Sequence, residues 1–390
     1  MKILLAGHAP LFPTTAGNRQ RLLALLSELS AIGHVVHFCH IAADPGDTVA
    51  MQKMLGERFH HFPYDASRLR APRLRLWNDF LPVRAYNRMM HYLRLPRLDF
   101  GFRRIGRRVD DWYDPELSDF LRGLQARHRF EVVIVAYVFF SKALEVFPPG
   151  VLRILDTVEK FTGRSRVGEH YLSWRQERRG LRRADRVLAI QQREAEHFQS
   201  MVSPSKVFVV GHIVEGHESC KDHATPSLLF LGSGNDANRD GIQFFLHEIW
   251  PRIKIEVPDV QLLIAGKVGD SVAPSPGIER LGVVEDVAGI MQQAAVVICP
   301  LRFGTGLKIK VIEALAAGKA VAATSVGAEG LENGKGRALL VSDDPTEFAR
   351  NVVLLVRDPE RRRSLGQGAL MLIDELNRAS RSQLAAALQR

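Results

Sequence analysis

The sequence predicts an α/β protein with two tandem Rossmann-like domains, each a doubly wound parallel sheet, that face each other across a cleft. Short, continuously apolar runs, typical of strands buried on both faces, alternate with helical patterns along the whole chain. The 390 residues are too many for one ordinary hydrophobic core. A polar stretch at 211–226 divides the alternation into two series, so we expect two domains joined by a linker.

The first series predicts an N-terminal domain over residues 1–212. Leucines on one face of residues 17–32 predict an amphipathic helix, which ends at Gly33 and His34. A second helix is expected over residues 116–127. The apolar runs of this series predict strands at 2–6, 35–39, 132–137, 152–155 and 187–190.

The second series predicts a C-terminal, ligand-binding domain over residues 225–370. Its expected strands lie at 227–231, 260–265, 280–282, 295–299, 320–324 and 338–341. Its expected helices lie at 241–255, 286–293, 307–317 and 346–357. The last residues, 371–390, predict a helix that packs back toward the N-terminal domain. Because ligands of parallel α/β sheets lie at the carboxyl ends of the strands, two such sheets provide an interdomain cleft.

Composition indicates an ordinary globular protein of the cytoplasm. Apolar residues make up 46% of the chain and charged residues 25%, and no apolar run approaches the roughly 18–20 residues that span a membrane. Residues 1–12 are too few for a secretory signal and are better explained as a core strand and its loop. Cys39, Cys220 and Cys299 lie far apart, which favours reduced thiols over a disulfide framework.

Basic residues are concentrated in one segment, residues 68–108, of a chain with net charge +10. Twelve arginines but only two aspartates fall in this segment, interleaved with aromatic residues. Such a segment suits the surface of an anionic membrane, where each basic side chain contributes about 1 kcal/mol, or an acidic polymer. No nucleic-acid recognition motif accompanies it. We expect peripheral contact with the inner face of the plasma membrane and no nucleic-acid partner; the alternative is a solvated insertion whose aromatic residues pack locally.

One segment combines features that a purely structural role leaves unexplained. The turn Gly304-Thr305-Gly306 opens a helix that is apolar on nearly all sides, yet this helix carries Glu313 and has Lys308 and Lys310 at its start. A carboxylate is rarely buried without a partner, and lysines oppose the dipole at a helix N-terminus. A phosphorylated sugar ligand would explain both features, because its phosphates would meet the amide groups and lysines. The alternative is a tight turn with solvent-facing lysines.

A second glycine loop follows the first expected strand and leads to Gly17 at a helix start. Gly17 either brings its backbone close to a ligand from the opposite wall of the cleft or simply begins the helix. The loop lacks the GxGxxG pattern, and no acidic residue ends the second strand, so the sequence excludes a dinucleotide fingerprint.

The histidines and acidic residues predict no metal site. His34 and His37 are three positions apart on an expected strand, where side chains alternate between faces, so they point in opposite directions. His40 and the pair His60-His61 offer no better spacing. The chain also lacks a DxD-like acidic pair at a strand end. Glu194 begins an expected helix, where a carboxylate simply favours the helix dipole.

The C-terminal half carries a series of motifs over residues 228–331: LLFLGS, NRDGIQFFLHEIWP, PDVQLLIAG, LGVVEDV, CPLRFGTGLKIKVIEALAAGKAVAAT and VGAEGL. In their order and spacing these motifs resemble the retaining glycosyltransferases of family 4, which have the GT-B fold. The N-terminal half is similar through its first strand and loop and through AYVFFSKAL, LDTVEKFTGR and ADRVLAIQQREAEHF.

This resemblance implies transfer of a sugar from a nucleoside-diphosphate donor, held mainly by the C-terminal domain, with no metal ion or other cofactor. Glu313 would match the second glutamate of the family's E-x7-E element and bind the ribose hydroxyls. Arg302 and Lys308 would bind the diphosphate, with Gly232 and Ser233 beside it. The other donor-binding residues would be Gly304, Thr305, Gly306 and Leu307, and the acceptor or phosphate loop would contain Gly17, Asn18 and Arg164.

Two positions depart from the family pattern. Thr305 stands where the first glutamate of E-x7-E contacts the donor sugar in the family. Val158 stands where relatives often have a histidine near the reacting carbon. Because valine cannot act as a general base, the nearby carboxylates Asp156 and Glu159 become the candidate catalytic residues.

The sequence thus predicts a glycosyltransferase that acts on a cell-envelope, polysaccharide or lipid-linked acceptor. Two alternatives stay open. One is a nucleotide-sugar-binding protein of the same fold with impaired catalysis, which Val158 favours. The other is a sugar-nucleotide epimerase, which shares the two-domain plan.

Overall fold

A computed structural model describes residues 1–42, 46–64, 108–162, 172–217 and 226–389 of the chain. Nearly all of the basic segment 68–108 lies outside these residues, as do Arg164 and Cys220. The other two cysteines, Cys39 and Cys299, are buried free thiols, and burial raises the pKa of Cys39 to about 12. The expected reduced state therefore holds for both cysteines that the structure describes.

The N-terminal domain is built on a seven-stranded sheet in the order β3-β2-β1-β4-β5-β6-β7, with all neighbouring strands parallel. The strands are β1 Lys2–Gly7, β2 Val35–Ala42, β3 Phe59–Pro63, β4 Val132–Ala136, β5 Leu152–Asp156, β6 Arg186–Ala189 and β7 Val207–Val209. The central strands are the continuously apolar runs of the sequence, and every residue of β4 is buried. The edge strands β3 and β7 were not expected, because their short and mixed sequences lack that signal.

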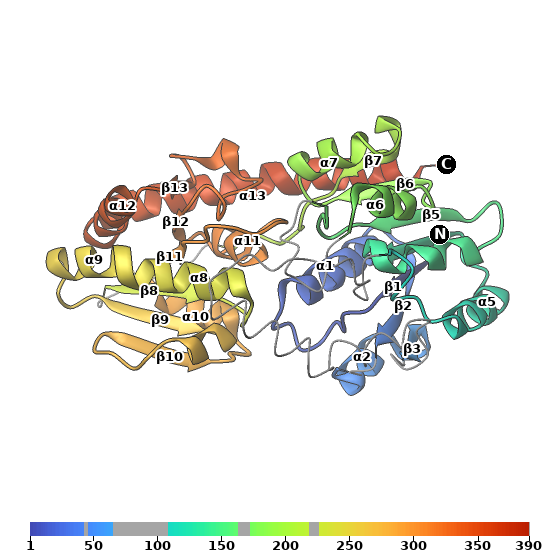
Figure 1. The fold of residues 1–390 in the computed structure, drawn as a ribbon, viewed down its shortest axis with the longest axis horizontal. Helices are drawn as coiled ribbons and strands as arrows, with labels where there is room; N and C mark the ends of the chain where they lie inside the picture. Colours follow the sequence, from blue (N-terminus) through green and yellow to red (C-terminus); the bar gives the residue numbers. More distant parts are fainter. Residues whose placement is uncertain (43–45, 65–107, 163–171, 218–225, 390) are drawn as a thin grey trace, which may run out of the picture.

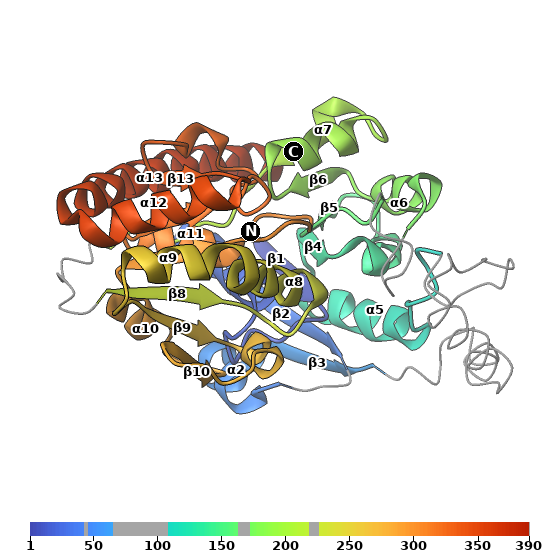
Figure 2. The same cartoon turned by 60° about the vertical axis from the view of Figure 1, so that its left-hand side comes forward.

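Helices cover both faces of this sheet (Figure 1). The α-helices are α1 Gly17–Ala31, α2 Thr48–Leu55, α5 Glu116–His128, α6 Trp174–Leu181 and α7 Gln192–Gln199. Helix α2 lies beside β3 at one edge of the sheet (Figure 2), and α7 lies beside β7 at the other edge (Figure 1). Leu22, Leu25, Leu26 and Leu29 of α1 are buried, so the expected apolar face packs into the core.

The C-terminal domain is built on a six-stranded parallel sheet in the order β10-β9-β8-β11-β12-β13. Its strands are β8 Ser227–Leu231, β9 Gln261–Ala265, β10 Ile278–Gly282, β11 Val296–Cys299, β12 Ala320–Ala323 and β13 Leu339–Val341. Its helices are α8 Asp236–Phe244, which a π-turn at Phe245–Ile249 joins to α9 Trp250–Glu256, then α10 Val287–Gln293, α11 Ile309–Ala316, α12 Pro345–Arg357 and α13 Pro359–Leu388. The fold is the expected α/β arrangement of two doubly wound sheets.

Strand order defines one switch point in each sheet. In the first sheet β1 pairs with β2 on one side and β4 on the other. In the second sheet β8 lies between β9 and β11 in the same way. The loops that leave the carboxyl ends of these strands diverge to opposite faces of the sheet, which opens a crevice for ligands. The loops after β1, β4, β8 and β11 are therefore the places to look for a site.

Helix α13 links the two hydrophobic cores. It is 30 residues long and begins at Pro359, behind an N-cap in which Asp358 accepts a hydrogen bond from the Arg361 N–H. Its first half packs into the C-terminal core, whereas Leu384, Ala387 and Leu388 belong to the N-terminal core. Figure 1 shows this helix running from the C-terminal domain onto the N-terminal domain. Residues 371–388 of the expected C-terminal helix lie within α13.

None of the helices in the described part of the chain combines the length and the apolar composition that crossing a bilayer requires.

Candidate functional site

The first residues of two helices from different domains touch each other. A Cβ atom placed on Gly17, where α1 begins, would lie 3.1 Å from the Cβ and Cγ1 atoms of Ile309, where α11 begins. The two helices lie side by side at the junction of the domains (Figure 1). Helix α1 follows the switch-point loop of the first sheet, and α11 follows the loop that leaves β11. The glycine loop and the lysine-bearing turn of the sequence therefore lie together at the domain junction.

Neither helix start is capped or compensated by a residue of its own helix. Ala16 and Lys308, the N-cap residues, make no side-chain cap, and neither helix has an acidic residue in its first turn. By contrast, Asp47, Asn235, Asp286 and Asp344 cap the starts of α2, α8, α10 and α12. Each helix start carries about half a positive charge, so two starts in contact repel each other unless an anion lies nearby.

The turn before α11 requires glycine. Gly304 has φ 137° and Gly306 has φ 77°, conformations that other residues rarely adopt. A Cβ atom on Gly306 would lie 3.5 Å from the Cβ of Glu159 and 3.8 Å from the carbonyl oxygen of Val158. The expected donor turn of the C-terminal domain thus lies against the expected catalytic loop of the N-terminal domain.

Lys308 folds back over this turn. Its Nζ donates a 2.7 Å hydrogen bond to the Gly306 carbonyl and lies 3.4 Å from Oε2 of Glu329. The Glu329 carboxylate is also 3.9 Å from the guanidinium of Arg193, which comes from the N-terminal domain. The side chain of Lys308 is only 11% exposed, so it does not face open solvent.

Glu313 and Lys310 form a second, mostly buried ion pair on α11. The Lys310 Nζ lies 3.1 Å from Oε2 of Glu313, and their side chains are 24% and 16% exposed. Burial raises the pKa of Glu313, while the charge of Lys310 and a hydrogen bond from Gln20 of α1 act in the opposite direction. Both lysines are thus paired with glutamates, and neither side chain faces open solvent.

The turn after β8 makes its contacts within the C-terminal domain. The Gly232 N–H donates to the Ala265 carbonyl at 2.9 Å, and a Cβ atom on Gly232 would lie 3.0 Å from a methyl group of Val268. The Ser233 hydroxyl accepts a 3.1 Å hydrogen bond from the side-chain amide of Asn238 on α8. Gly232 and Ser233 therefore hold the chain close to the start of α8.

Arg302 is already engaged by α8. Its Nε donates a 2.8 Å hydrogen bond to Oδ2 of Asp240, and a second guanidinium nitrogen donates to Oδ1. The guanidinium also lies over the Phe244 ring, 5.0 Å from its centroid. About half of the side chain is exposed, so Arg302 lies at the rim of the domain and its charge is paired.

Asp156, at the end of β5, lies in a fully buried ion pair. The Arg21 guanidinium of α1 contacts both carboxylate oxygens, with the shortest distance 2.7 Å. The same guanidinium donates to the carbonyls of Val210 and Gly211, at the start of the linker. Asp156 thereby fixes α1 against β5 and the linker, and its side chain is not accessible to solvent.

Two non-glycine residues with positive φ stand at the carboxyl ends of neighbouring strands. Val158, just after β5, has φ 60°, and the Glu159 N–H donates a 2.6 Å hydrogen bond to the Thr157 carbonyl, which makes a γ-turn around Val158. Tyr137, just after β4, has φ 69° and donates its N–H to the Asp156 carbonyl. A β-branched residue with positive φ is strained, and such strain gathers at functional sites.

Glu194 joins the two domains, a role that sequence reasoning missed. Its Oε1 accepts a 3.1 Å hydrogen bond from the Gly306 N–H and a 3.3 Å hydrogen bond from the Lys160 N–H. Oε2 is buried and has no hydrogen-bond partner among the described residues. Burial is the largest of the effects that raise the pKa of Glu194 to about 7, and the nearby carboxylate of Glu329 adds to it. No local pattern marks Glu194, because both donors are distant in the sequence.

A basic groove of about 460 Å³ lies on the N-terminal domain, around α6. Its described lining residues are Glu145, Arg153, Trp174, Arg175, Arg178, Arg179, Arg182 and Arg183. Arg153 pairs with Asp185, and Arg183 pairs with Asp110. Arg182 has no carboxylate partner within the part of the chain that the structure describes, so the groove keeps a net positive charge.

Comparison with known proteins finds a family model that matches part of the chain, within the C-terminal domain. Residues 225–358 match the family model described as glycosyl transferases group 1. A curated relative, described as an uncharacterized 44.6 kDa protein in the cps region of Klebsiella pneumoniae, is 24% identical over 168 residues. That alignment covers 38% of this chain and 42% of the relative, so the match spans less than half of either protein.

Solved structures match over almost the whole chain. A mutant of TarM from S. aureus, in complex with Fondaparinux, alpha-GlcNAc-glycerol and UDP, has a TM-score of 0.68 at 9% identity and 100% coverage of both chains. Alr3699/HepE from Anabaena, in complex with UDP and glucose, has a TM-score of 0.62 at 14% identity, with 99% of each chain covered. The sucrose-phosphate synthase of Thermosynechococcus elongatus has a TM-score of 0.64 at 14% identity, covering 98% of this chain and 97% of the synthase. The expected two-domain GT-B fold is confirmed.

Proposed function

We propose that this chain, whose C-terminal domain matches the family model of the glycosyl transferases group 1, transfers a sugar from a nucleoside-diphosphate donor to an acceptor. The observation that carries the proposal is the contact between Gly17 and Ile309, which joins two uncapped helix starts across the domain junction. A diphosphate there would neutralise both positive ends. As the glycosidic bond breaks, negative charge grows on the diphosphate, so the same groups would stabilise the transition state.

The donor-binding roles follow from the contacts of α11 and its turn. Gly304 and Gly306 would let the backbone approach the diphosphate closely, with Thr305 and Leu307 in the same turn. Lys308 would exchange its present contacts with the Gly306 carbonyl and Glu329 for the donor phosphates. These cationic groups support a reaction without a metal ion.

The nucleoside would be held beside α11. We assign the ribose contact to Glu313, and Lys310 would keep this carboxylate ionised against the effect of burial. Gly232 and Ser233 would line the site from the turn after β8. Arg302 would contribute at the rim, after leaving Asp240. UDP is bound in both TarM and Alr3699/HepE, which supports a nucleoside diphosphate as the donor class.

The strained loop after β5 would approach the reacting sugar. Glu159 would contact it, because its Cβ faces the glycine turn. Asp156 would act as a positioning residue, since it holds Arg21 and thereby α1 and Gly17. Asn18 would extend the phosphate loop, and its Oδ1 already accepts a hydrogen bond from the Arg19 N–H. A retaining mechanism is the form of the reaction that the family resemblance implies.

The acceptor would be a cell-envelope, polysaccharide or lipid-linked glycan reached at the inner face of the membrane. The arginine-rich segment 68–108 supports contact with an anionic surface, and the groove around α6 is a second basic surface. Arg164, assigned to the acceptor loop, would add one more positive charge.

A panel of nucleoside-diphosphate sugars tests the proposal. A donor that binds the folded state raises the temperature of unfolding, and slow release of free nucleoside diphosphate in its presence reports turnover. The matched variants are Lys308→Ala at the site and Lys335→Ala, an exposed lysine of the same domain. Absence of any stabilising donor would refute donor binding. Binding without hydrolysis or transfer would favour the catalytically impaired alternative that Val158 suggests, and conversion of the donor to an epimer would favour the epimerase.

A further inference from the structure

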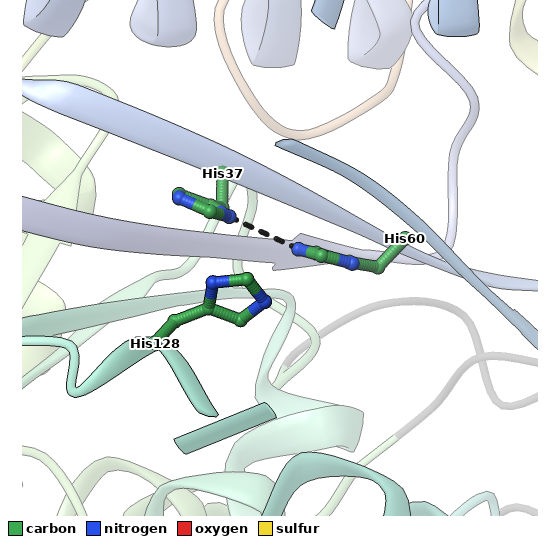
Figure 3. Close-up of side chains that lie close together, drawn as sticks. All are labelled: His37, His60 and His128. Carbon is green, nitrogen blue, oxygen red and sulfur yellow. Dashed lines mark hydrogen bonds between the residues drawn. The ribbon is translucent and has the colours of Figure 1, made fainter. Parts of the chain in front are cut away.

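Three histidines from separate parts of the chain converge in the N-terminal domain. His37 lies on β2, His60 lies on β3, and His128 is the last residue of α5 (Figure 3). One ring nitrogen from each lies within 4.8 Å of the other two. His37 Nδ1 and His60 Nε2 are 3.0 Å apart and share a hydrogen bond. Sequence spacing did not reveal this cluster, because it joins two strands and a helix end that tertiary packing brings together.

The cluster lies away from the site described above. His37 and His60 occur early in their strands, whereas the domain junction lies at the carboxyl ends. Two other histidines of the same strands, His40 and His61, lie on the opposite face of the sheet. His40 stacks on His61 with ring centroids 5.4 Å apart, and His61 Nε2 bonds to the Ala42 carbonyl. Because side chains alternate along a strand, His37 and His60 lie on one face of the sheet, and His40 and His61 lie on the other.

The protonation state of the cluster suits metal ligands. Burial lowers the pKa of both His37 and His60 to about 4 and also lowers the pKa of His128. All three rings are therefore neutral at pH 7 and carry lone pairs. Moreover, His128 Nε2 is buried without a hydrogen-bond partner among the described residues. A polar nitrogen in that position is costly unless something binds it.

We propose that His37, His60 and His128 form a binding site for a divalent transition metal of the zinc type, which ties β2, β3 and α5 together. Zinc binds imidazole nitrogens at about 2.0–2.1 Å, so three nitrogens around one ion are separated by roughly 3.3 Å. His37 Nδ1 and His60 Nε2 are 3.0 Å apart, and all three nitrogens lie within 4.8 Å of one another. The fourth position would take water or a small anion. The positive charges of Lys2, Arg58 and Arg127 favour an anion there, and Glu57 beside His128 partly offsets them.

The test is a metal titration of the full-length, untagged chain after removal of bound metal. Co²⁺ should bind at one equivalent and produce the visible absorption of a tetrahedral site, and Zn²⁺ should displace it. His60→Gln should weaken Zn²⁺ binding by more than about 100-fold, because it removes a ligand rather than a supporting group. His61→Gln, on the opposite face of the same strand, should bind as the unmodified chain does.

Two outcomes would overturn the proposal. One is a chain that gives no tetrahedral Co²⁺ absorption at one equivalent. The other is equal loss of binding in His60→Gln and His61→Gln, which would indicate unspecific histidine binding. Circular dichroism of both variants, together with a His128→Gln variant at the helix end, separates ligand loss from misfolding, because His128→Gln leaves both strands unchanged. Failure of this test would leave the proposed glycosyl transfer untouched.

Discussion

The backbone N–H of Gly306 donates a 3.1 Å hydrogen bond to the side chain of Glu194, and this bond crosses from one domain to the other. Gly306 belongs to the turn before α11, and Glu194 belongs to the first turn of α7. The second carboxylate oxygen of Glu194 is buried among described residues without a hydrogen-bond partner. The turn before α11 is therefore coupled directly to a titratable group of the opposite domain.

Glu194 should make stability depend on pH. Its pKa rises from 4.5 in the unfolded chain to about 7 in the folded protein, so the folded state binds the proton more tightly. This contribution is fully present below pH 4.5 and is lost as the pH rises through about 7. The full effect is at most about 3 kcal/mol. As the pH rises through this range, the free energy of unfolding in urea should fall less for Glu194→Gln than for the unmodified chain. Identical dependence of this free energy on pH in the two proteins would contradict the prediction.

Asp156→Ala should be strongly destabilising. The substitution leaves the Arg21 guanidinium buried without its carboxylate partner, which costs about 3–5 kcal/mol. Asp185→Ala is the control, because the Arg153–Asp185 pair is about one third exposed and such pairs contribute about 1 kcal/mol or less. Equilibrium unfolding in urea measures both changes. Equal losses in the two variants would show that burial of the Arg21–Asp156 pair has no special importance.

Gly17→Ala should impair donor binding more than folding. The new methyl group would lie 3.1 Å from the Ile309 side chain, so it would push the two helix starts apart. We expect the affinity for a nucleoside diphosphate to fall about tenfold, equivalent to about 1.4 kcal/mol. Gly123→Ala in α5 is the control, since nothing lies within 4 Å of its Cβ position and alanine favours helix. Isothermal titration calorimetry measures this affinity. Unchanged affinity in Gly17→Ala would show that the diphosphate does not bind at this junction.

Glu329→Gln should strengthen diphosphate binding, whereas Lys308→Ala should weaken it. The Glu329 carboxylate lies 3.4 Å from the Lys308 ammonium and competes with phosphate for it. Removing that negative charge should tighten binding severalfold, because charge-assisted contacts contribute about 1.5–3 kcal/mol. The control is Glu332→Gln, because Glu332 is exposed and pairs with Arg193 rather than with Lys308. Opposite signs for the two site variants support the assignment, and weakening by both would show that Glu329 supports the turn rather than competing with the ligand.

Local patterns in the chain were sufficient for much of the architecture. The apolar strands, the leucine face of α1 and the glycines at 304 and 306 depend on periodicity and backbone sterics, which act between residues close in sequence. The same patterns predicted the Gly17 loop and the lysines of α11 as candidate ligand groups. Short edge strands such as β3 were missed, because they carry little apolar signal.

Tertiary structure alone decided which of these groups meet. The Arg21–Asp156 pair spans 135 positions, the Gly306–Glu194 bond spans 112, and the histidine cluster joins two strands with the end of α5. Such contacts depend on how two sheets and their helices pack, and no local propensity encodes them. The sequence by itself determined the two-domain α/β fold and its candidate phosphate turn. Packing decided that Asp156 is buried, that Glu194 spans the domains, and that two positive helix ends share one junction.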